Sequence, residues 1–282
     1  MLTNRQLKEY INQARDGRLS SDKFNRICDF ILKESNIDQL IVFVRNVKNV
    51  DLGAFGNRVW HEGDAEQNFE FATIDCVDSR AFRERIIRLG DIEFNIRAGK
   101  QIRDEYHEDY INKHGQVVLK GSAYQNFKYL KHNKSKKLNR QAHLDAIINS
   151  GNTYVNYITA KEIEDADVQA HGDVIIKSKD IPTNMAFIKL ENAKVYEHLQ
   201  VISQYGSAYD NLDVIKCVDN YDISSNLVNI FSSSDEDVKY ESWMWLKSKR
   251  ILTRYKYLYP IRKFESTIKN ANLEPEEVHS IS

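Results

Sequence analysis

Residues 64–90 read DAEQNFEFATIDCVDSRAFRERIIRLG, and much of the chain is a variation on this stretch. Further copies, some shortened or lengthened, occupy residues 36–63, 91–115, 122–151, 152–179, 180–206 and 207–234, and a partial copy begins at Asp235. Self-similarity at a fixed period is the sequence signature of a repeat architecture. These copies therefore decide the expected fold.

Each copy contains two helical patterns. It opens with Asp, Asn or Ser, which cap helix N-termini, and Phe69, Phe71 and Ile74 follow at helical spacing. Asp78 is placed to cap a second helix. That helix ends at a glycine, which supplies a left-handed backbone after a helix, in five copies: Gly63, Gly90, Gly115, Gly151 and Gly206. Short helices are marginal alone but bury a continuous core when stacked. We therefore predict an all-α fold, an α-solenoid of about seven to eight helical-hairpin repeats of roughly 25–30 residues.

Two columns of the repeat alignment hold one polar residue type in several copies. The fifth position is asparagine in six copies: Asn68, Asn95, Asn126, Asn156, Asn184 and Asn211. These amides either line a binding face or tie each unit to its neighbour; the second interpretation is favoured because such residues usually bond to local backbone. The other column holds His107, His143, His171 and His198, after Phe55 and Phe82 in earlier copies. Neighbouring repeats are about 8–10 Å apart, too far to share a metal ion, so packing or surface-lining roles are expected.

The composition excludes several classes of protein. The 282 residues carry a net charge of −1 and include 29% charged residues, 41% apolar residues and three prolines, as expected for a soluble helical protein. No apolar run reaches the roughly 20 residues of a membrane span, and the N-terminus lacks the apolar region of a signal peptide. Cys28, Cys76 and Cys217 form no CxxC pair, which argues against a zinc site and for a reducing, cytoplasmic setting. We expect no metal and no other cofactor, and expect Cys76 and Cys217 to fill the core.

Three segments are expected along the chain. Residues 1–35 form an N-terminal helical cap, because a terminal repeat needs an atypical outer face. Residues 36–240 form the helical-hairpin array. Residues 241–282 form a C-terminal basic and aromatic helical segment with a tail.

Two windows concentrate positive charge. The local charge is +8 between Tyr110 and Leu144 and +7 between Leu246 and Phe264, with no acidic residue in either window, so the remaining residues carry −16. We expect phosphate contacts from these cations: Lys128, Lys131, Lys134, Lys136, Lys137, Arg140, Lys247, Lys249, Arg250, Arg254, Lys256, Arg262 and Lys263. Rings beside cations suit base stacking, and the candidates are Trp243, Trp245, Tyr255 and Tyr257. At least one of the two tryptophans is expected in the core, since they cannot share one helix face. Merely solvated basic segments are the alternative.

A tryptophan, an aspartate and an arginine carry a resemblance to a known family. Trp60 precedes Asp64 by four residues, and Arg97 lies farther on. The array resembles the HEAT-like α-solenoids, whose units are longer, about 40–47 residues, and the three residues resemble the site of the HEAT-like alkylpurine DNA glycosylases. That resemblance implies a basic concave face around duplex DNA and metal-independent excision of a damaged or modified base, with Asp64, Trp60 and Arg97 near the nucleotide. In the repeat alignment, Asp64 also shares a column with capping residues such as Asp91, and Trp60 shares one with Ile87, which is expected in the core.

Two functions from different classes are compatible with the sequence. The first is a DNA-binding helical-repeat protein, which the resemblance extends to a glycosylase: a carboxylate stabilises the oxocarbenium-like sugar while cations hold the flanking phosphates. The alternative is a non-enzymatic scaffold that binds a protein partner in the solenoid groove. The nucleotide-binding and metalloprotease motifs GxxxxGK[ST], GxGxxG and HExxH are absent, which both functions allow. Salt dependence separates the two, because phosphate binding weakens steeply with ionic strength.

Overall fold

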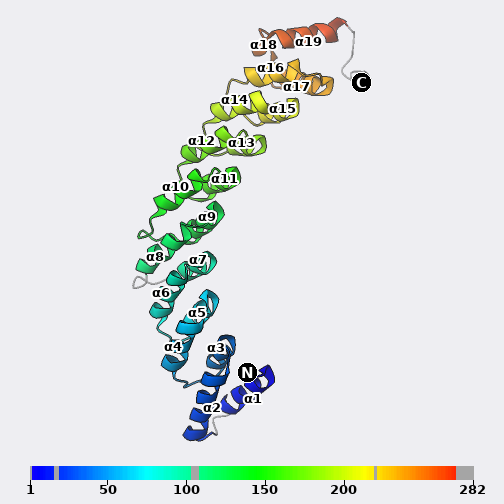
Figure 1. The fold of residues 1–282 in the computed structure, drawn as a ribbon. Coiled ribbons are helices and arrows are strands. Elements are labelled where there is room, and N and C mark those ends of the chain that lie inside the picture. Colours follow the sequence, from blue (N-terminus) through cyan, green and yellow to red (C-terminus); the bar gives the residue numbers. More distant parts are fainter. Residues whose placement is uncertain (1, 16–18, 103–107, 219–220, 271–282) are drawn as a thin grey trace. The chain divides into compact units, whose positions relative to one another are not determined.

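The fold is entirely helical in the part of the chain that the computed structural model describes, residues 2–15, 19–102, 108–218 and 221–270 (Figure 1). Successive helices pack as hairpins, and each hairpin packs on the next within its unit. The predicted α-solenoid of helical hairpins is confirmed. Contacts divide the chain into two compact units, Met1–Ala146 and Ile147–Ser282.

The first unit begins with a helix pair that precedes the repeats, and α1 of this pair packs against α3. Its helices are α1 (Asn4–Arg15), α2 (Ser21–Glu34), α3 (Ile37–Asn46), α4 (Leu52–Glu62), α5 (Ala65–Ala72), α6 (Ser79–Leu89), α7 (Ile92–Lys100), α8 (Glu108–Val118) and α9 (Ala123–His132). Helix α10 (Arg140–Asn149) begins in this unit and ends in the second. The pairs α3–α4, α5–α6 and α7–α8 are the hairpins predicted from the copies.

The second unit continues the same alternation. Its helices are α11 (Thr153–Glu162), α12 (Val168–Ser178), α13 (Ile181–Phe187), α14 (Val195–Tyr205), α15 (Ala208–Cys217), α16 (Ser224–Ser232), α17 (Glu236–Ser248), α18 (Leu252–Tyr255) and α19 (Tyr259–Asn270). Helices α11 to α16 form three hairpins. After them, α17 packs on α15 and α16, and α19 packs on α16.

Capping side chains set the start of most helices. The residue that opens a copy accepts a backbone N–H and forms a reciprocal capping box at Asn36, Asp64, Ser122 and Ser207. The second helices α4, α6 and α12 begin at Asp51, Asp78 and Asp167, whose carboxylates accept N–H groups of the first turn. Each such cap is worth about 1 kcal/mol, which matters for helices of 8–14 residues that are marginal alone.

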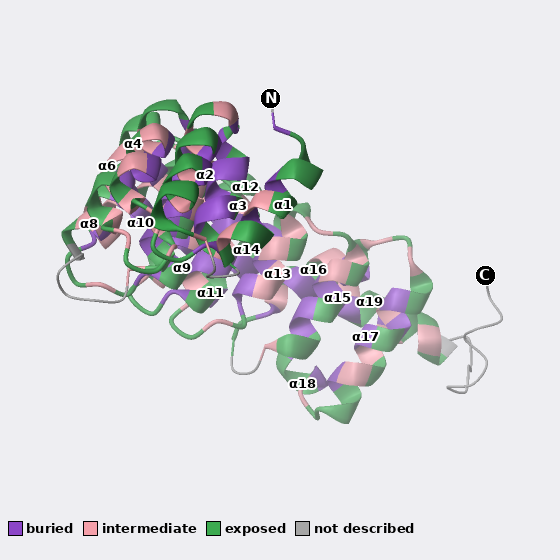
Figure 2. Ribbon diagram, turned by 90° about the horizontal axis from the view of Figure 1, so that it is seen from below, coloured by how far each residue is buried: buried purple, intermediate pink, exposed green. Residues whose placement is uncertain are grey.

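Apolar faces of adjacent helices supply most of the stability. Figure 2 shows the buried residues as stripes along the helices, with exposed residues on the opposite faces. In the first unit Phe43 and Phe55 are fully buried, and their rings stack 5.8 Å apart across one hairpin. Phe71 and Phe82 repeat this contact in the next hairpin, at 4.9 Å. Burying one such ring is worth roughly 1.5–3 kcal/mol.

Glycine follows the second helices for two different structural reasons. Gly90 and Gly151 have φ values of 73° and 68°, so the predicted left-handed conformation is confirmed there. It is wrong for Gly63 and Gly206, whose backbones are extended. At those positions an added Cβ would lie 2.5–2.6 Å from a carbonyl oxygen of the preceding turn, so close backbone approach excludes a side chain.

Three local predictions also need correction. Gly115 does not end its helix, because α8 continues to Val118 and residues 116–118 belong to the helix. Cys76 does not fill the core: it is exposed in the turn between α5 and α6, with a φ of 68°. Cys217, the last residue of α15, is exposed as well. Both cysteines lie where a helix has ended, outside the buried stripe.

A buried ladder of asparagines ties each hairpin to the one before it. All six predicted side chains are 0% exposed: Asn68, Asn95, Asn126, Asn156, Asn184 and Asn211. The Nδ2 group of Asn184, for example, donates to the carbonyl of Ile175 near the end of α12 (3.2 Å) and to that of Asp180 (2.8 Å). Carbonyls at a helix end have no partner within the helix, so the amide satisfies them. The inter-repeat interpretation is confirmed, and these amides line no exposed face.

A histidine from the second helix completes the ladder in four hairpins. Nδ1 of the histidine lies 2.6–2.7 Å from Oδ1 of the asparagine in the pairs Asn95–His114, Asn126–His143, Asn156–His171 and Asn184–His198. Because each Nδ2 group faces carbonyls, Oδ1 accepts the bond, and Nδ1 carries the proton. His107, which the repeat alignment placed in this column, lies outside the described residues. His114 makes the contact to Asn95.

Two hairpins show what replaces the histidine. In α15–α16, Asn226 donates to Oδ1 of Asn211 (2.7 Å), which keeps the bond with an amide. In α5–α6, Phe82 holds the position, and Oδ1 of Asn68 has no partner. The ladder therefore tolerates variation in its second member, while the asparagine is common to all six hairpins.

Burial makes the ladder histidines poor bases. It lowers the pKa of His114 to about 3, and the charges of Arg83 and Lys113 act in the same direction. It lowers the pKa values of His143, His171 and His198 to about 4. Nε2 of three of them, His114, His171 and His198, has no hydrogen-bond partner among the residues that the structure describes. These imidazoles are therefore neutral near pH 7.

Candidate nucleic-acid interface

The first basic window forms a loop that is anchored at both ends. Between α9 and α10, Asn133 and Leu138 are buried, and Nδ2 of Asn133 donates to the carbonyl of Tyr129 (3.0 Å). The lysines between these anchors, at 134, 136 and 137, are exposed. The loop thus holds three ammonium groups at the surface by fixing its own backbone.

Several cations of this window already have partners. Lys128 pairs with Glu93 on α7 (2.7 Å), and Lys137 pairs with Asp109 on α8 (3.2 Å). The guanidinium of Arg140 donates to the carbonyl of Asn133 (2.6 Å), so this side chain closes the loop. The two ion pairs lie at the surface, where such pairs are worth about 0–1 kcal/mol. A phosphate can therefore compete for Lys128 and Lys137, whereas the loop's structure depends on Arg140.

A lysine outside the window joins the same surface. Burial lowers the pKa of His132, at the end of α9, and the charges of Lys100, Lys131 and Lys128 lower it further. The ammonium group of Lys100, at the end of α7, is therefore close enough to raise the potential there. We call the α9 basic surface the set Lys100, Lys128, Lys131, His132, Lys134, Lys136 and Lys137.

Lys100 was not predicted as a site residue, because it lies outside the two continuous windows of positive charge. The repeat alignment contained the signal, since a lysine follows the ladder asparagine by five residues in five copies: Lys100, Lys131, Lys161, Lys189 and Lys216. Stacking brings equivalent positions of adjacent hairpins together. Lysine in the last turn also compensates the negative end of the helix dipole, for about 0.3–1 kcal/mol, so the column alone does not identify a site.

Several cations of the second basic window contact an acidic side chain or an aromatic ring. Lys256 lies 3.8 Å from Glu265, and Nζ of Lys247 lies over the ring of Trp243 at 4.2 Å. Arg254 stacks on Tyr255 at 5.5 Å. Lys249, Arg250, Arg262 and Lys263 are exposed. Acidic neighbours and rings thus meet several of these cations, and the window presents a less uniform positive surface than its sequence does.

The rings predicted to stack on bases differ in accessibility. Tyr255 is 2% exposed within the core of the second unit, which leaves no free face for a base. Trp243 and Trp245 are half-buried and pack against the same core. Tyr257 is 64% exposed, and its hydroxyl lies 2.7 Å from Oγ of Ser224. Tyr257 alone of these four rings is largely open to solvent.

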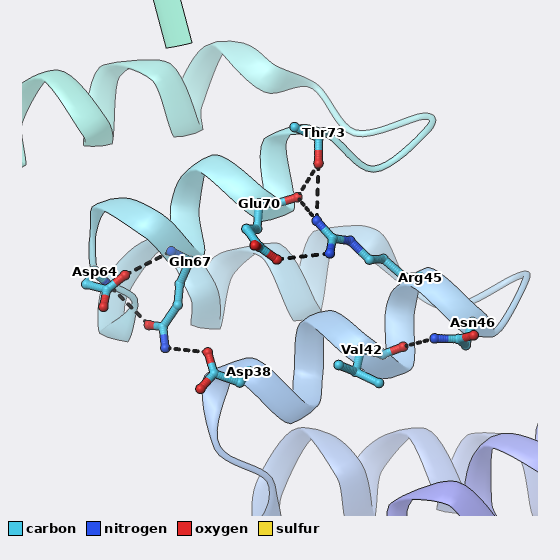
Figure 3. A network of polar contacts seen from close by, with 8 residues as sticks. All are labelled: Asp38, Val42, Arg45, Asn46, Asp64, Gln67, Glu70 and Thr73. Atoms are coloured by element: carbon cyan, nitrogen blue, oxygen red, sulfur yellow. Dashed lines mark hydrogen bonds and ion pairs between the residues drawn. The ribbon is translucent and has the colours of Figure 1, made fainter. Parts of the chain in front are cut away.

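The residues implied by the glycosylase resemblance have structural contacts. Figure 3 shows Asp64 as the cap of α5: its Oδ1 accepts the N–H of Gln67 (2.9 Å), and the amide of Gln67 donates to Asp38 on α3 (2.8 Å). The indole N–H of Trp60 donates to the carbonyl of Ala81 (3.1 Å). Capping and packing, the alternative interpretation of these two residues, are thus observed.

The guanidinium group of Arg97 packs against two aromatic rings. It lies 4.6 Å from the ring centre of Phe69 and 4.8 Å from that of Phe94. No hydrogen bond, ion pair or ring contact among the described residues joins Arg97, Asp64 and Trp60 to one another. The structure therefore does not bring the three residues together as one polar constellation.

No group of three or more His, Cys, Asp or Glu side chains is arranged to hold a metal ion in residues 2–15, 19–102, 108–218 and 221–270. Across those same ranges, no helix combines the length and the apolar character that crossing a bilayer would require.

Comparison with known proteins adds no relative. Neither protein-family models, nor curated proteins, nor solved structures give a match to this chain.

Proposed function

We propose that this chain is a helical-repeat protein that binds DNA through the α9 basic surface. The observation that carries the proposal is the concentration of ammonium groups from two adjacent hairpins and one anchored loop. Lys134 and Lys136 are exposed on that loop, and Lys100 and Lys131 are exposed at the ends of neighbouring first helices. Cations clustered on one surface bind phosphates and release condensed counterions.

The charge distribution supports a polyanionic partner. The first unit carries 25 Lys and Arg residues against 21 Asp and Glu residues, whereas the second carries 15 against 20. The positive surface thus belongs to the more basic unit, and the acidic unit would repel a nucleic acid placed elsewhere. The competing ion pairs at Lys128 and Lys137 are exposed and weak, so they cost little to exchange for phosphate contacts.

We propose DNA binding without base excision. Excision of a base needs a carboxylate close to the sugar together with groups that hold the nucleotide. Asp64, Trp60 and Arg97 instead cap a helix, pack against a core and stack between rings. Incubation with DNA that carries alkylated or otherwise modified bases, followed by alkali treatment, tests excision directly: strand breaks would extend the proposal to a glycosylase.

The binding proposal is tested by reversing two charges on the loop. The double variant Lys134→Glu/Lys136→Glu should bind a fluorescent DNA much more weakly than wild type in 50 mM salt, measured by anisotropy. The log–log slope of affinity against salt should also fall by roughly 1.4–1.8, because each of the two lost phosphate contacts removes about 0.7–0.9.

The chain offers a matched control with the same net charge. Lys177 and Lys189 are exposed in the second unit, so Lys177→Glu/Lys189→Glu changes the total charge equally but leaves the α9 basic surface intact. Circular dichroism checks that both variants are folded. An equal loss of affinity in both variants would show that net charge alone, and not the α9 basic surface, controls binding. Undiminished binding by the loop variant would refute the proposed role of the α9 basic surface and favour the protein-scaffold alternative.

A further inference from the structure

We propose that the α9 basic surface takes single-stranded nucleic acid, with one unpaired base stacked on the exposed ring of Tyr124. This inference rests on the proposed function and specifies the class of its ligand. Tyr124 lies in the first turn of α9 and is 52% exposed. Its ring centre is 6.1 Å from that of the buried Phe127, at an interplanar angle of 32°, so Phe127 contacts the ring while about half of the tyrosine stays open to solvent.

The ring lies in line with two ammonium groups of the surface. Lys128 and Lys131 follow Tyr124 by four and seven residues, so all three share one face of α9. At a rise of 1.5 Å per residue, Lys128 is about 6 Å and Lys131 about 10 Å farther along the helix axis. Nζ of Lys131 lies over the ring of Phe127 at 5.7 Å, which holds it on that face. The helix thus presents an aromatic face followed by cations along one line.

That order of groups fits an unpaired strand better than a duplex. In a duplex both faces of a base are covered by its neighbours, and a protein ring reaches them only by unstacking a step, at a cost of a few kcal/mol. In a single strand a base face is available, and stacking on an aromatic side chain is worth about 1–3 kcal/mol per base. The adjoining phosphates then reach the cations that follow on the helix.

The same repeat position elsewhere lacks a lysine four residues later, although a lysine seven residues later recurs. Tyr209 occupies it on α15 and is 54% exposed. The charge of Asp235 raises the pKa of Tyr209, and Asp237 and Glu241 act in the same direction. An anionic strand would be repelled there. Tyr209 therefore serves as a control with an equally open ring in the opposite electrostatic setting.

The experiment compares a fluorescent single-stranded oligonucleotide of mixed sequence with its duplex, by anisotropy at low and moderate salt. We expect wild type to bind the single strand more tightly. Tyr124→Ala should weaken single-strand binding about tenfold and leave duplex binding within twofold, whereas Tyr124→Phe should keep the wild-type affinity because the ring face remains. Tyr209→Ala should bind as wild type does.

The outcomes separate this inference from the proposed function. Salt-sensitive binding that is equal for both DNA forms and unaffected by Tyr124→Ala would overturn the stacked base while the basic surface stands. Loss of binding in Tyr124→Ala and Tyr124→Phe alike would overturn stacking, because it would point to the hydroxyl or to the fold. Absence of any salt-sensitive binding to either form would overturn the proposed function and the inference together.

Discussion

Acidification should unfold this protein well before its carboxylates are protonated, because of the histidines in the ladder. In the native state Nδ1–H of each of the four donates to an asparagine, and protonation at Nε2 would place a charge in a site without solvent. Burial lowers the pKa of His114 to about 3 and those of the other three to about 4. The unfolded chain has ordinary histidines with a pKa of about 6.5.

The sign and size of the effect follow from proton binding. Because the folded pKa values are lowered, the neutral histidines contribute stability above pH 6.5 and lose that contribution as the pH falls toward 4. At pH 5.5 each unfolded histidine is about 90% protonated, which costs the folded state about 1.4 kcal/mol per histidine. Four histidines give about 5.5 kcal/mol, comparable to the whole stability of many domains, about 5–15 kcal/mol.

The groups around the four imidazoles do not reverse this sign. Arg83 and Lys113 near His114, and Arg140 near His143, disfavour protonation further. Asp167 near His171 favours it, as does Asp173 near His198, where Lys194 opposes it, yet burial outweighs both carboxylates. The expected loss of stability therefore comes from all four positions.

Urea denaturation at pH 7.5 and 5.5, followed by far-UV circular dichroism, measures the loss. The matched variant is His171→Asn/His198→Asn, because Asn226 already makes the same bond to Asn211 without titrating. This variant should lose about half of the pH dependence, whatever its stability at pH 7.5. A change below about 1 kcal/mol in wild type, or an undiminished change in the double variant, would refute the reasoning. An NMR titration placing the His171 pKa near 6.5 would do the same.

Two further substitutions test the packing between hairpins. Asn184→Ala removes the amide that bonds to Ile175, Asp180 and His198, and leaving these buried groups unpaired should lower the free energy of unfolding by about 3 kcal/mol in urea titrations; a loss below 1 kcal/mol would contradict the ladder. Gly99→Ala places a Cβ 2.6 Å from the ring of the buried Tyr129, so its thermal transition should drop, corresponding to about 1–3 kcal/mol. An unchanged midpoint would show that the ring can move aside.

The fold was predictable because its signals are local and repeated. A first capping residue such as Asp64 and an apolar face such as that of Phe69 and Phe71 recur from copy to copy, and a second cap such as Asp78 recurs in several of them, so the copies support the same prediction. The position of the third copy's histidine was not predictable in this way. Asn95 and His114 are 19 residues apart, whereas Asn184 and His198 are 14 apart. Because this spacing varies, the alignment of the shortened copy selected His107 instead.

The candidate site was less predictable, because charge counted along the sequence ignores partners in space. Lys128 and Lys137 belong to a window without acids, yet Glu93 and Asp109 pair with them from α7 and α8. Tyr255 belongs to an interleaved aromatic run, yet its ring is in the core. The exposure of Lys134 and Lys136 was easier to anticipate, because both lie in a polar loop between two helices.

The contacts between hairpins and the proposed binding residues belong to different columns of the repeat, and this separation makes the proposed function testable. The buried asparagine is the same in six hairpins and carries the contacts between them. Exposed positions vary: two residues after the cap the chain has Glu66, Glu93, Tyr124, Tyr154, Pro182 or Tyr209. Tyrosine coincides with lysines four and seven residues later only in the copy that contains α9. Because Tyr124 lies on the exposed face of α9, its replacement should change stability by less than about 0.5 kcal/mol. A loss of affinity would then report on the surface itself.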